Sequence, residues 1–259
     1  MKKLTLLLIP VLLVGACRLT PAGGGATPIG ASVSGCQAMV NNMSGLTRDL
    51  KIPKYFQAET PAKHGGEFDV TQYFGVLNHL SMQPGYALDY VYHFDGMGGY
   101  PVLYANPASQ SPYASEADLS AAGNTPNYLD YVQTDDTPEG YFQFVLLALM
   151  GNQFYLDWHA NYNDMQLVCD KAAVMAAVAS TDHITGSPMP LVDRLKARSL
   201  SQVEPHVLIG DQTVEVRIVT FTKWGGFYRQ TYTLQRLSPH AILDVQKVNI
   251  LHYDCGVMF

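Results

Sequence analysis

The last third of the chain alternates apolar and polar residues over four short runs, and turn residues separate these runs. A period of two is typical of strands that bury one face, and short turns between successive strands require antiparallel pairing. The four expected strands cover residues 204–209, 213–222, 227–236 and 242–252. The pattern therefore predicts an antiparallel meander of four strands in the C-terminal third.

The clearest helix pattern lies between Thr137 and Gly151. Thr137 suits the N-cap position, Pro138 suits the first helical position, and Gly151 is a typical helix stop. The residues from Tyr141 to Met150 are almost all apolar, and this run is too short to cross a membrane. The pattern predicts a helix that is buried in the core of a globular domain.

Weaker patterns predict further elements between residues 34 and 200. Runs rich in Tyr and Val at 86–94 and 101–105 predict one hairpin, and the runs 153–159 and 165–169 predict a second. Apolar residues at helical spacing predict five helices, at residues 36–43, 70–82 with Asp69 as N-cap, 116–122, 172–179 with Asp170 as N-cap, and 190–200.

Helices and antiparallel strands in one chain predict an α+β fold. We expect an antiparallel sheet that ends in the C-terminal four-strand meander, with several helices packed on one face. A hydrophobic content of 47% with 15% charged residues is sufficient for a sizeable core and argues against disorder.

The N-terminus has the features of a secretory signal. Lys2 and Lys3 precede an apolar stretch from Leu4 to Val14, which is far shorter than the roughly 20 residues of a membrane-spanning helix. The run Leu13-Val14-Gly15-Ala16-Cys17 resembles the bacterial lipobox. The resemblance implies that residues 1–16 are removed as a signal peptide and that Cys17 carries covalent lipid.

The resemblance also implies a location. The protein is expected to be exported and held by lipid in the cell envelope, and Arg18 after Cys17 implies the outer membrane if the source is Gram-negative. Residues 17–34 are rich in Gly, Ala, Thr and Pro and have no hydrophobic period, so we expect a lipidated flexible tether there. Residues 35–259 are expected to form a single α+β domain.

Charge and cysteine content restrict the possible partners. The net charge is -6, and the charged residues do not form long runs. The sequence therefore predicts no positively charged surface that would bind nucleic acid. The basic residues Arg194, Lys196 and Arg198 are interpreted as one solvated helix face. After Cys17, export would allow at most one intramolecular disulfide and one remaining thiol, and the sequence leaves the pairing open. The three cysteines concerned are Cys36, Cys169 and Cys255.

Several catalytic motifs are absent, including the Gly-x-Ser-x-Gly elbow, the His-Glu-x-x-His zinc motif and Cys-x-x-Cys. The tripeptide Asp254-Cys255-Gly256 resembles the Asp-Cys-Ser-Gly nucleophile motif of the NlpC-type cell-wall peptidases. In that family the cysteine begins a helix and a histidine follows it. The few residues after Cys255 provide neither feature, so we interpret Cys255 as a disulfide partner or a buried thiol.

Three pairs of imidazole and carboxylate stand two residues apart in expected strands or strand ends. Side chains at this spacing point to the same side of a strand. Such pairs could hold a divalent metal or perform general acid/base chemistry. Alternatively, they are solvated residues on different edges of the sheet. The candidate catalytic residues are His93 with Asp95, Asp157 with His159, and His252 with Asp254.

Two functional hypotheses follow. The first is a non-catalytic binding module that is anchored to the membrane through its lipid and binds an envelope protein or a small polar ligand. The second is an envelope hydrolase that uses the His/Asp pairs, with or without a divalent metal. Apart from the lipid on Cys17, no cofactor is expected. The aromatic residues proposed as ligand contacts, which could equally fill the core, are Tyr90, Tyr92, Tyr100, Tyr104 and Trp224.

Overall fold

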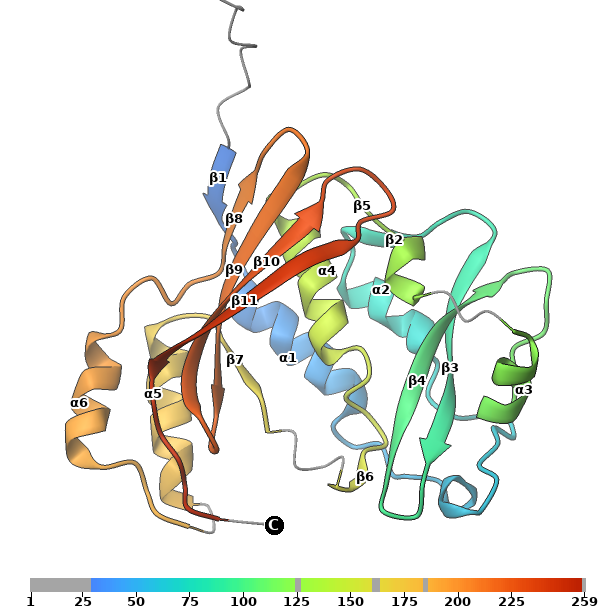
Figure 1. The fold of residues 1–259 in the computed structure, drawn as a ribbon, viewed down its shortest axis with the longest axis horizontal. Helices are drawn as coiled ribbons and strands as arrows, with labels where there is room; N and C mark the ends of the chain where they lie inside the picture. The colour runs from blue at the N-terminus through green and yellow to red at the C-terminus, as the bar shows by residue number, and fades with distance from the viewer. Residues whose placement is uncertain (1–28, 124–126, 160–163, 184–185, 258–259) are drawn as a thin grey trace, which may run out of the picture.

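The computed structural model describes residues 29–123, 127–159, 164–183 and 186–257 (Figure 1). Its main sheet is antiparallel throughout and has the strand order β1-β8-β9-β10-β11, with β7 also paired to β9. Strands β8 and β7 pair one after the other along the same edge of β9. The strands are β1 (Ile29–Ser32), β7 (Gln166–Val168), β8 (His206–Ile209), β9 (Thr213–Thr222), β10 (Gly226–Gln235) and β11 (Ile242–Leu251).

Two smaller sheets complete the strand content of the described residues. The three-stranded sheet, to the right of the main sheet in Figure 1, has the order β3-β4-β6. The two-stranded sheet joins β2 to β5. The bounds are β2 (Leu80–Met82), β3 (Tyr86–Phe94), β4 (Gly98–Pro107), β5 (Val132–Thr134) and β6 (Asp157–Trp158).

The described residues contain six α-helices. The central one is α4, in which the Thr137 side chain accepts a hydrogen bond from the Gly140 N–H and Pro138 occupies the first turn. Every residue from Gly140 to Leu147 is buried, as expected for a core helix. The helices are α1 (Cys36–Thr47), α2 (Tyr73–Val76), α3 (Glu116–Ala121), α4 (Pro138–Met150), α5 (Lys171–Ser180) and α6 (Leu191–Ser199).

Helices cover both faces of the main sheet. Alternate residues of β9 point to opposite faces. Val216 and Ile218 belong to the larger apolar cluster, which includes the buried side of α4. Val219 and Phe221 belong to a second cluster together with the buried residues of α5. The α+β class and the C-terminal meander are thus confirmed, whereas the helices pack on two faces rather than one.

Most of the locally predicted elements are present. The first hairpin is formed by β3 and β4, and the predicted short helices near residues 116, 172 and 190 correspond to α3, α5 and α6. The Asp170 side chain caps α5 by accepting a hydrogen bond from the Ala173 N–H. Each of these elements is specified locally, because the residues that start it, the residues that end it and its hydrophobic period all lie within the element or next to it.

The predicted helix at residues 70–82 is wrong. Asp69 does cap a turn, because its side chain accepts from the Thr71 N–H, but only a 3-10 turn (Val70–Gln72) and the single-turn α2 follow. The helix ends at Val76, and Leu80–Met82 pairs with β5 instead. Tertiary strand pairing outweighs the helical spacing of the apolar residues in this segment.

The second predicted hairpin is also wrong. Its two runs do form short strands, but β6 pairs with β4 and β7 pairs with β9, so they belong to different sheets. The folded domain also begins earlier than residue 35, because Ile29–Ser32 pairs with β8 as strand β1. The predicted signal peptide, Cys17 and residues 18–28 of the predicted tether lie outside the described residues.

Within the described part of the chain, no helix is both long and apolar enough to cross a membrane.

Candidate functional site

Two of the three predicted His/Asp pairs lie at one end of the β3–β4 hairpin. His93 is close to the end of β3, and Asp95 lies in the turn that follows. Strand β6 pairs with the start of β4, which brings Asp157 there, and the His159 N–H donates to the Met97 carbonyl at 3.4 Å. The register between strands therefore unites four of the six candidate residues.

The side chains of these residues serve local structure. The imidazole Nδ1 of His93 lies 2.7 Å from a carboxylate oxygen of Glu116, a residue outside the predicted set. Asp95 accepts hydrogen bonds from two backbone N–H groups of its own turn, and these donors hold the pKa of its carboxyl below the usual range. Asp157 accepts from the side-chain amide of Gln57 at 2.8 Å. The exposed ring of His159 stacks on Trp158.

The third pair lies just after the last strand of the main sheet. His252 and Asp254 are exposed and follow the end of β11, and the Asp254 side chain accepts from the Gly256 N–H at 2.8 Å. Among the residues that the structure describes, no group of three or more His, Cys, Asp or Glu side chains could hold a metal ion. The geometry thus gives no assembled metal centre in support of the hydrolase hypothesis.

Three of the five aromatic candidates are core residues. Tyr90, Tyr92 and Tyr104 are each 1% exposed, and the Tyr92 hydroxyl donates to the Tyr155 carbonyl. Burial raises the pKa of all three hydroxyls far above the ordinary value for tyrosine. They are therefore wrong as surface contacts, although Tyr100 is exposed and Trp224 is half-buried.

A disulfide joins Cys36 to Cys169, and Cys255 is a buried free thiol. This resolves the pairing that the sequence left open. Cys36 is the first residue of α1, and Cys169 stands between β7 and α5. The bond therefore fastens the start of α1 to the segment that connects β7 with α5.

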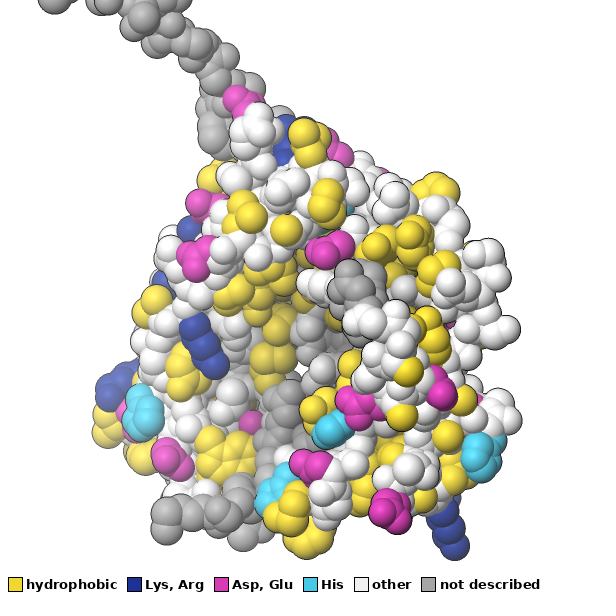
Figure 2. All heavy atoms as spheres, turned by 45° about the vertical axis from the view of Figure 1, so that its right-hand side comes forward, with side chains coloured by type: hydrophobic (Ala, Val, Ile, Leu, Met, Phe, Trp, Pro, Cys, Tyr) yellow, Lys and Arg dark blue, Asp and Glu magenta, His cyan; other side chains and the backbone are white. Residues whose placement is uncertain are grey.

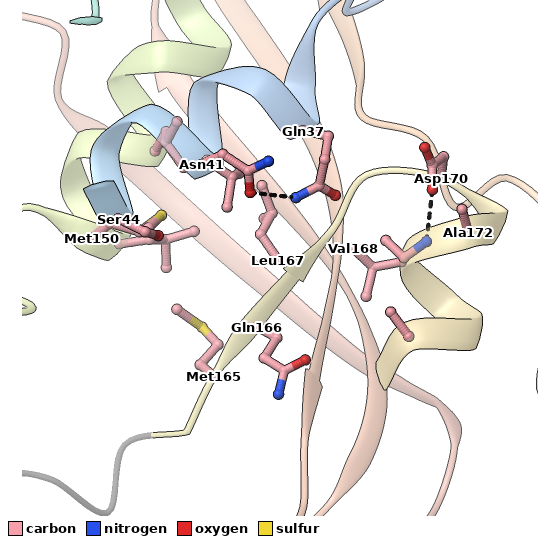
Figure 3. Close-up of a pocket in the computed structure, with 15 residues that line it drawn as sticks. Gln37, Asn41, Ser44, Met150, Met165, Gln166, Leu167, Val168, Asp170 and Ala172 are labelled. Atoms are coloured by element: carbon pink, nitrogen blue, oxygen red, sulfur yellow. Dashed lines mark hydrogen bonds between the residues drawn. The ribbon is translucent and has the colours of Figure 1, made fainter. Parts of the chain in front are cut away.

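Beside this disulfide lies a hollow of about 520 Å³ between four elements (Figure 3). Its walls are α1 on one side and β7 with the first turns of α5 on the other, and the end of α4 contributes Leu146, Leu149 and Met150. Among the described residues that line it, Asp170 is the only charged one. The remaining described residues around the hollow are Gln37, Val40, Asn41, Ser44, Met165, Gln166, Leu167, Val168, Ala172, Ala173 and Ala176.

Three of the polar side chains around this hollow already have partners. The side-chain amide of Gln37 donates to that of Asn41 at 3.0 Å, one turn further along α1. The Asp170 carboxylate accepts a hydrogen bond from the backbone N–H of Ala173, in the first turn of α5, at 2.7 Å. Both hydrogen bonds are drawn in Figure 3. The surface left for a ligand is accordingly mostly aliphatic and thioether.

A second hollow, of about 680 Å³, continues from the first. Both are lined by Ser44, Met150 and Met165, so they meet along the second half of α1. The second hollow extends past Arg48 and Lys51, two exposed cations for which the described chain provides no ion pair. We call the two hollows together the α1 groove. The first hollow is mainly apolar, whereas the second is lined by a mixture of apolar and polar residues that includes the two cations.

The lining of the α1 groove suits binding better than acid/base chemistry. No histidine or cysteine is among the described residues that line either hollow. The sequence does not reveal this site, because its walls come from residues near 40, 150, 168 and 173, and each wall has the pattern of an ordinary helix or strand. No protein-family model, curated protein or solved structure matches the chain. Any function proposed for the site therefore rests on the geometry of the groove.

Proposed function

We propose that the chain is an exported envelope lipoprotein, attached to a membrane through Cys17, whose α1 groove binds an extended amphiphile with an acidic end group. The observation that carries this proposal is a mainly apolar hollow that adjoins a second hollow lined in part by Arg48 and Lys51. An acyl chain with a carboxylate or phosphate is the simplest ligand of that description.

The size and lining of the groove support such a ligand. Ligand pockets are usually about 300–1,000 Å³ in volume and mostly apolar, with a few polar groups that fix orientation. Two half-buried methionines, Met150 and Met165, stand where the hollows meet. The flexible thioether side chain of methionine adapts its shape to irregular apolar surfaces, so this junction could follow the bends of an acyl chain.

The charge distribution supports an acidic end group. The chain as a whole carries a net charge of -6, so its net electrostatic field disfavours anions. Arg48 and Lys51 present two cations in the second hollow of the groove. An anionic head group there would be attracted electrostatically to both cations, whereas an uncharged head group would not be attracted to either of them.

The proposed location rests on the lipobox-like N-terminus and accords with the disulfide. Disulfides such as Cys36–Cys169 form and persist in exported proteins and are rare in reducing compartments. Lipid at Cys17 would hold the groove close to a membrane, which is a source of amphiphiles.

The first test fills the groove. Residues 17–259 with Cys17→Ser contain the entire described fold and cannot be acylated. In this protein, Ala176→Trp places a large ring at an exposed position that lines the groove. Ala179→Trp is the matched control, because Ala179 is exposed on the same helix and lines neither hollow. We expect Ala176→Trp to weaken hexadecanoate binding at least tenfold and Ala179→Trp to leave it unchanged.

The second test addresses the end group. Arg48→Gln with Lys51→Gln should weaken binding of hexadecanoate at least fivefold and leave binding of hexadecanol unchanged, since the alcohol has no charge to lose. Equilibrium dialysis with radiolabelled ligands measures both. If the unchanged protein does not bind hexadecanoate, or if Ala176→Trp and Ala179→Trp bind it equally, the proposed site is wrong.

A further inference from the structure

Helix α6 presents its apolar side to solvent. Leu191, Val192 and Leu195 are 71%, 63% and 55% exposed, whereas Ala197 is fully buried against the second apolar cluster. A surface helix normally turns its large apolar residues toward the core and its charged residues toward water. The arrangement in α6 is the reverse.

Helical geometry shows that the three exposed residues form one stripe. At about 100° per residue, Leu191, Leu195 and Val192 fall within an arc of about 100° on the helix surface. The middle of that arc lies nearly opposite Ala197, the residue by which α6 contacts the core. The stripe therefore points straight outward, away from the domain.

Cations stand on both sides of this stripe. By the same geometry, Arg198 lies about 20° beyond Leu191 and Lys196 about 40° beyond Val192. Lys171, the first residue of α5, donates to the Arg198 carbonyl at 3.3 Å and so adds a third cation to this surface. Lys196 is also paired with Asp193 at 2.8 Å.

The stripe and its flanking cations form what we call the α6 face, made of Leu191, Val192, Leu195, Lys171, Lys196 and Arg198. In the described residues, no ion pair neutralises Lys171 or Arg198. On the side of the molecule shown in Figure 2, by contrast, Lys and Arg side chains mostly stand apart from one another. A local positive charge on an acidic protein favours an anionic partner.

We infer that the α6 face docks on an anionic lipid surface, with Leu191, Val192 and Leu195 in the boundary between head groups and acyl chains. Basic residues beside an exposed aliphatic stripe are the features of helices that lie in a membrane interface. A second copy of the chain is a poorer occupant, because a twofold contact would bring the cations of the two faces together.

The docking surface adds to the proposed function without depending on the α1 groove. Lipid on Cys17 would keep the domain near the bilayer, and the α6 face would fix which side of the domain meets it. The test nevertheless uses the protein without lipid, residues 17–259 with Cys17→Ser, so that any membrane binding comes from the folded chain.

The experiment measures partition onto vesicles by sedimentation. One vesicle type is phosphatidylcholine with about one third phosphatidylglycerol, and the other is phosphatidylcholine alone. We expect the protein to prefer the anionic vesicles. Leu191→Ser with Leu195→Ser should lower the partition coefficient at least tenfold, because two large aliphatic side chains no longer enter the interface. Lys196→Gln with Arg198→Gln should lower it on anionic vesicles only, by about fivefold for each cation.

A matched control removes equally exposed apolar residues elsewhere. Leu243 and Val248 on β11 are 55% and 58% exposed, so Leu243→Ser with Val248→Ser should leave partition unchanged. All substituted side chains are exposed, and unchanged melting temperatures would verify that each variant is folded.

The inference would be overturned by any of these results: no preference for anionic vesicles, an equal loss in the β11 control, or a stable dimer that dissociates in the α6 variant. Ala176→Trp blocks the α1 groove and should still bind vesicles. If vesicle binding is lost with Ala176→Trp and retained in the α6 variants, the groove extracts lipid and the α6 face is not the docking surface. Failure of one proposal is thus distinguishable from failure of the other.

Discussion

Removal of the Cys36–Cys169 disulfide should destabilise the domain strongly. The two cysteines are 133 residues apart, so the bond closes more than half of the chain into one loop. In the chain-entropy model, a loop of this length restricts the unfolded state by about 5 kcal/mol at 25 °C, and removal of native disulfides typically costs about 2–5 kcal/mol. A domain of ordinary stability unfolds with about 5–15 kcal/mol, so the loss is a large fraction of the total.

Urea unfolding with and without reductant measures this loss. With a denaturant slope of about 2–3 kcal/mol per molar, the expected loss lowers the urea midpoint by about 1–2 M. Cys36→Ala with Cys169→Ala should lower it by a similar amount and should show no further response to reductant. Cys255→Ala is the matched control, because it removes the buried free thiol and keeps the disulfide. It should respond to reductant as the unchanged protein does.

The same bond should also affect the α1 groove, because it fastens the start of α1 to the segment before α5. Reduction is expected to weaken hexadecanoate binding even where the protein remains folded, since the two walls are no longer held at that end. If mass spectrometry verifies complete reduction and the urea midpoint does not move, the reasoning from loop entropy is refuted for this chain.

Three further predictions concern the core, an ion pair and the anchor. Leu146→Asp buries an unpaired charge at a position that is 1% exposed, so we expect a loss of several kcal/mol, and an unchanged melting temperature would contradict it. The Arg236 guanidinium holds the pKa of Asp136 below its usual range, which stabilises the fold above the unfolded pKa. Asp136→Asn should therefore lower the urea midpoint at pH 7, and the difference should shrink as pH falls through the lowered pKa; equal differences at about pH 7 and about pH 2.5 would exclude this. Cys17→Ser should release the protein from the membrane fraction or leave it uncleaved, and unchanged attachment would refute the lipid anchor.

Elements specified by nearby residues could be predicted from the sequence. Thr137, Pro138 and Gly151 mark both ends of α4, and every residue from Gly140 to Leu147 is buried as expected. In the meander, alternation and tight turns determine each strand and its neighbour together, because successive strands pair through short connections. Local sequence is sufficient wherever the partner of an element is the next element along the chain.

Pairing between distant segments could not be predicted in this way. The segments around residues 157 and 167 do become strands, but β6 joins β4 and β7 joins β9. Strand propensity describes a segment and not its partner, so two adjacent strand-like runs wrongly predict one hairpin. The same reason explains β1, whose residues Ile29–Ser32 have no strand pattern of their own and are ordered by pairing with β8.

The candidate sites also separate into features that nearby residues specify and features that depend on contacts between distant segments. A spacing of two residues correctly places two side chains on one side of a strand, yet it says nothing about the third group that a catalytic or metal site needs, and His93 has Glu116 as its partner instead. The α1 groove depends on contact between helix α1 and the segment from Met165 to Ala176, which are far apart in the sequence. Knowledge of one contact between the two segments is enough to predict that the two main walls of the groove lie side by side. Cys36 begins α1 and Cys169 precedes the cap of α5, so the chemical identification of that single disulfide places both walls side by side.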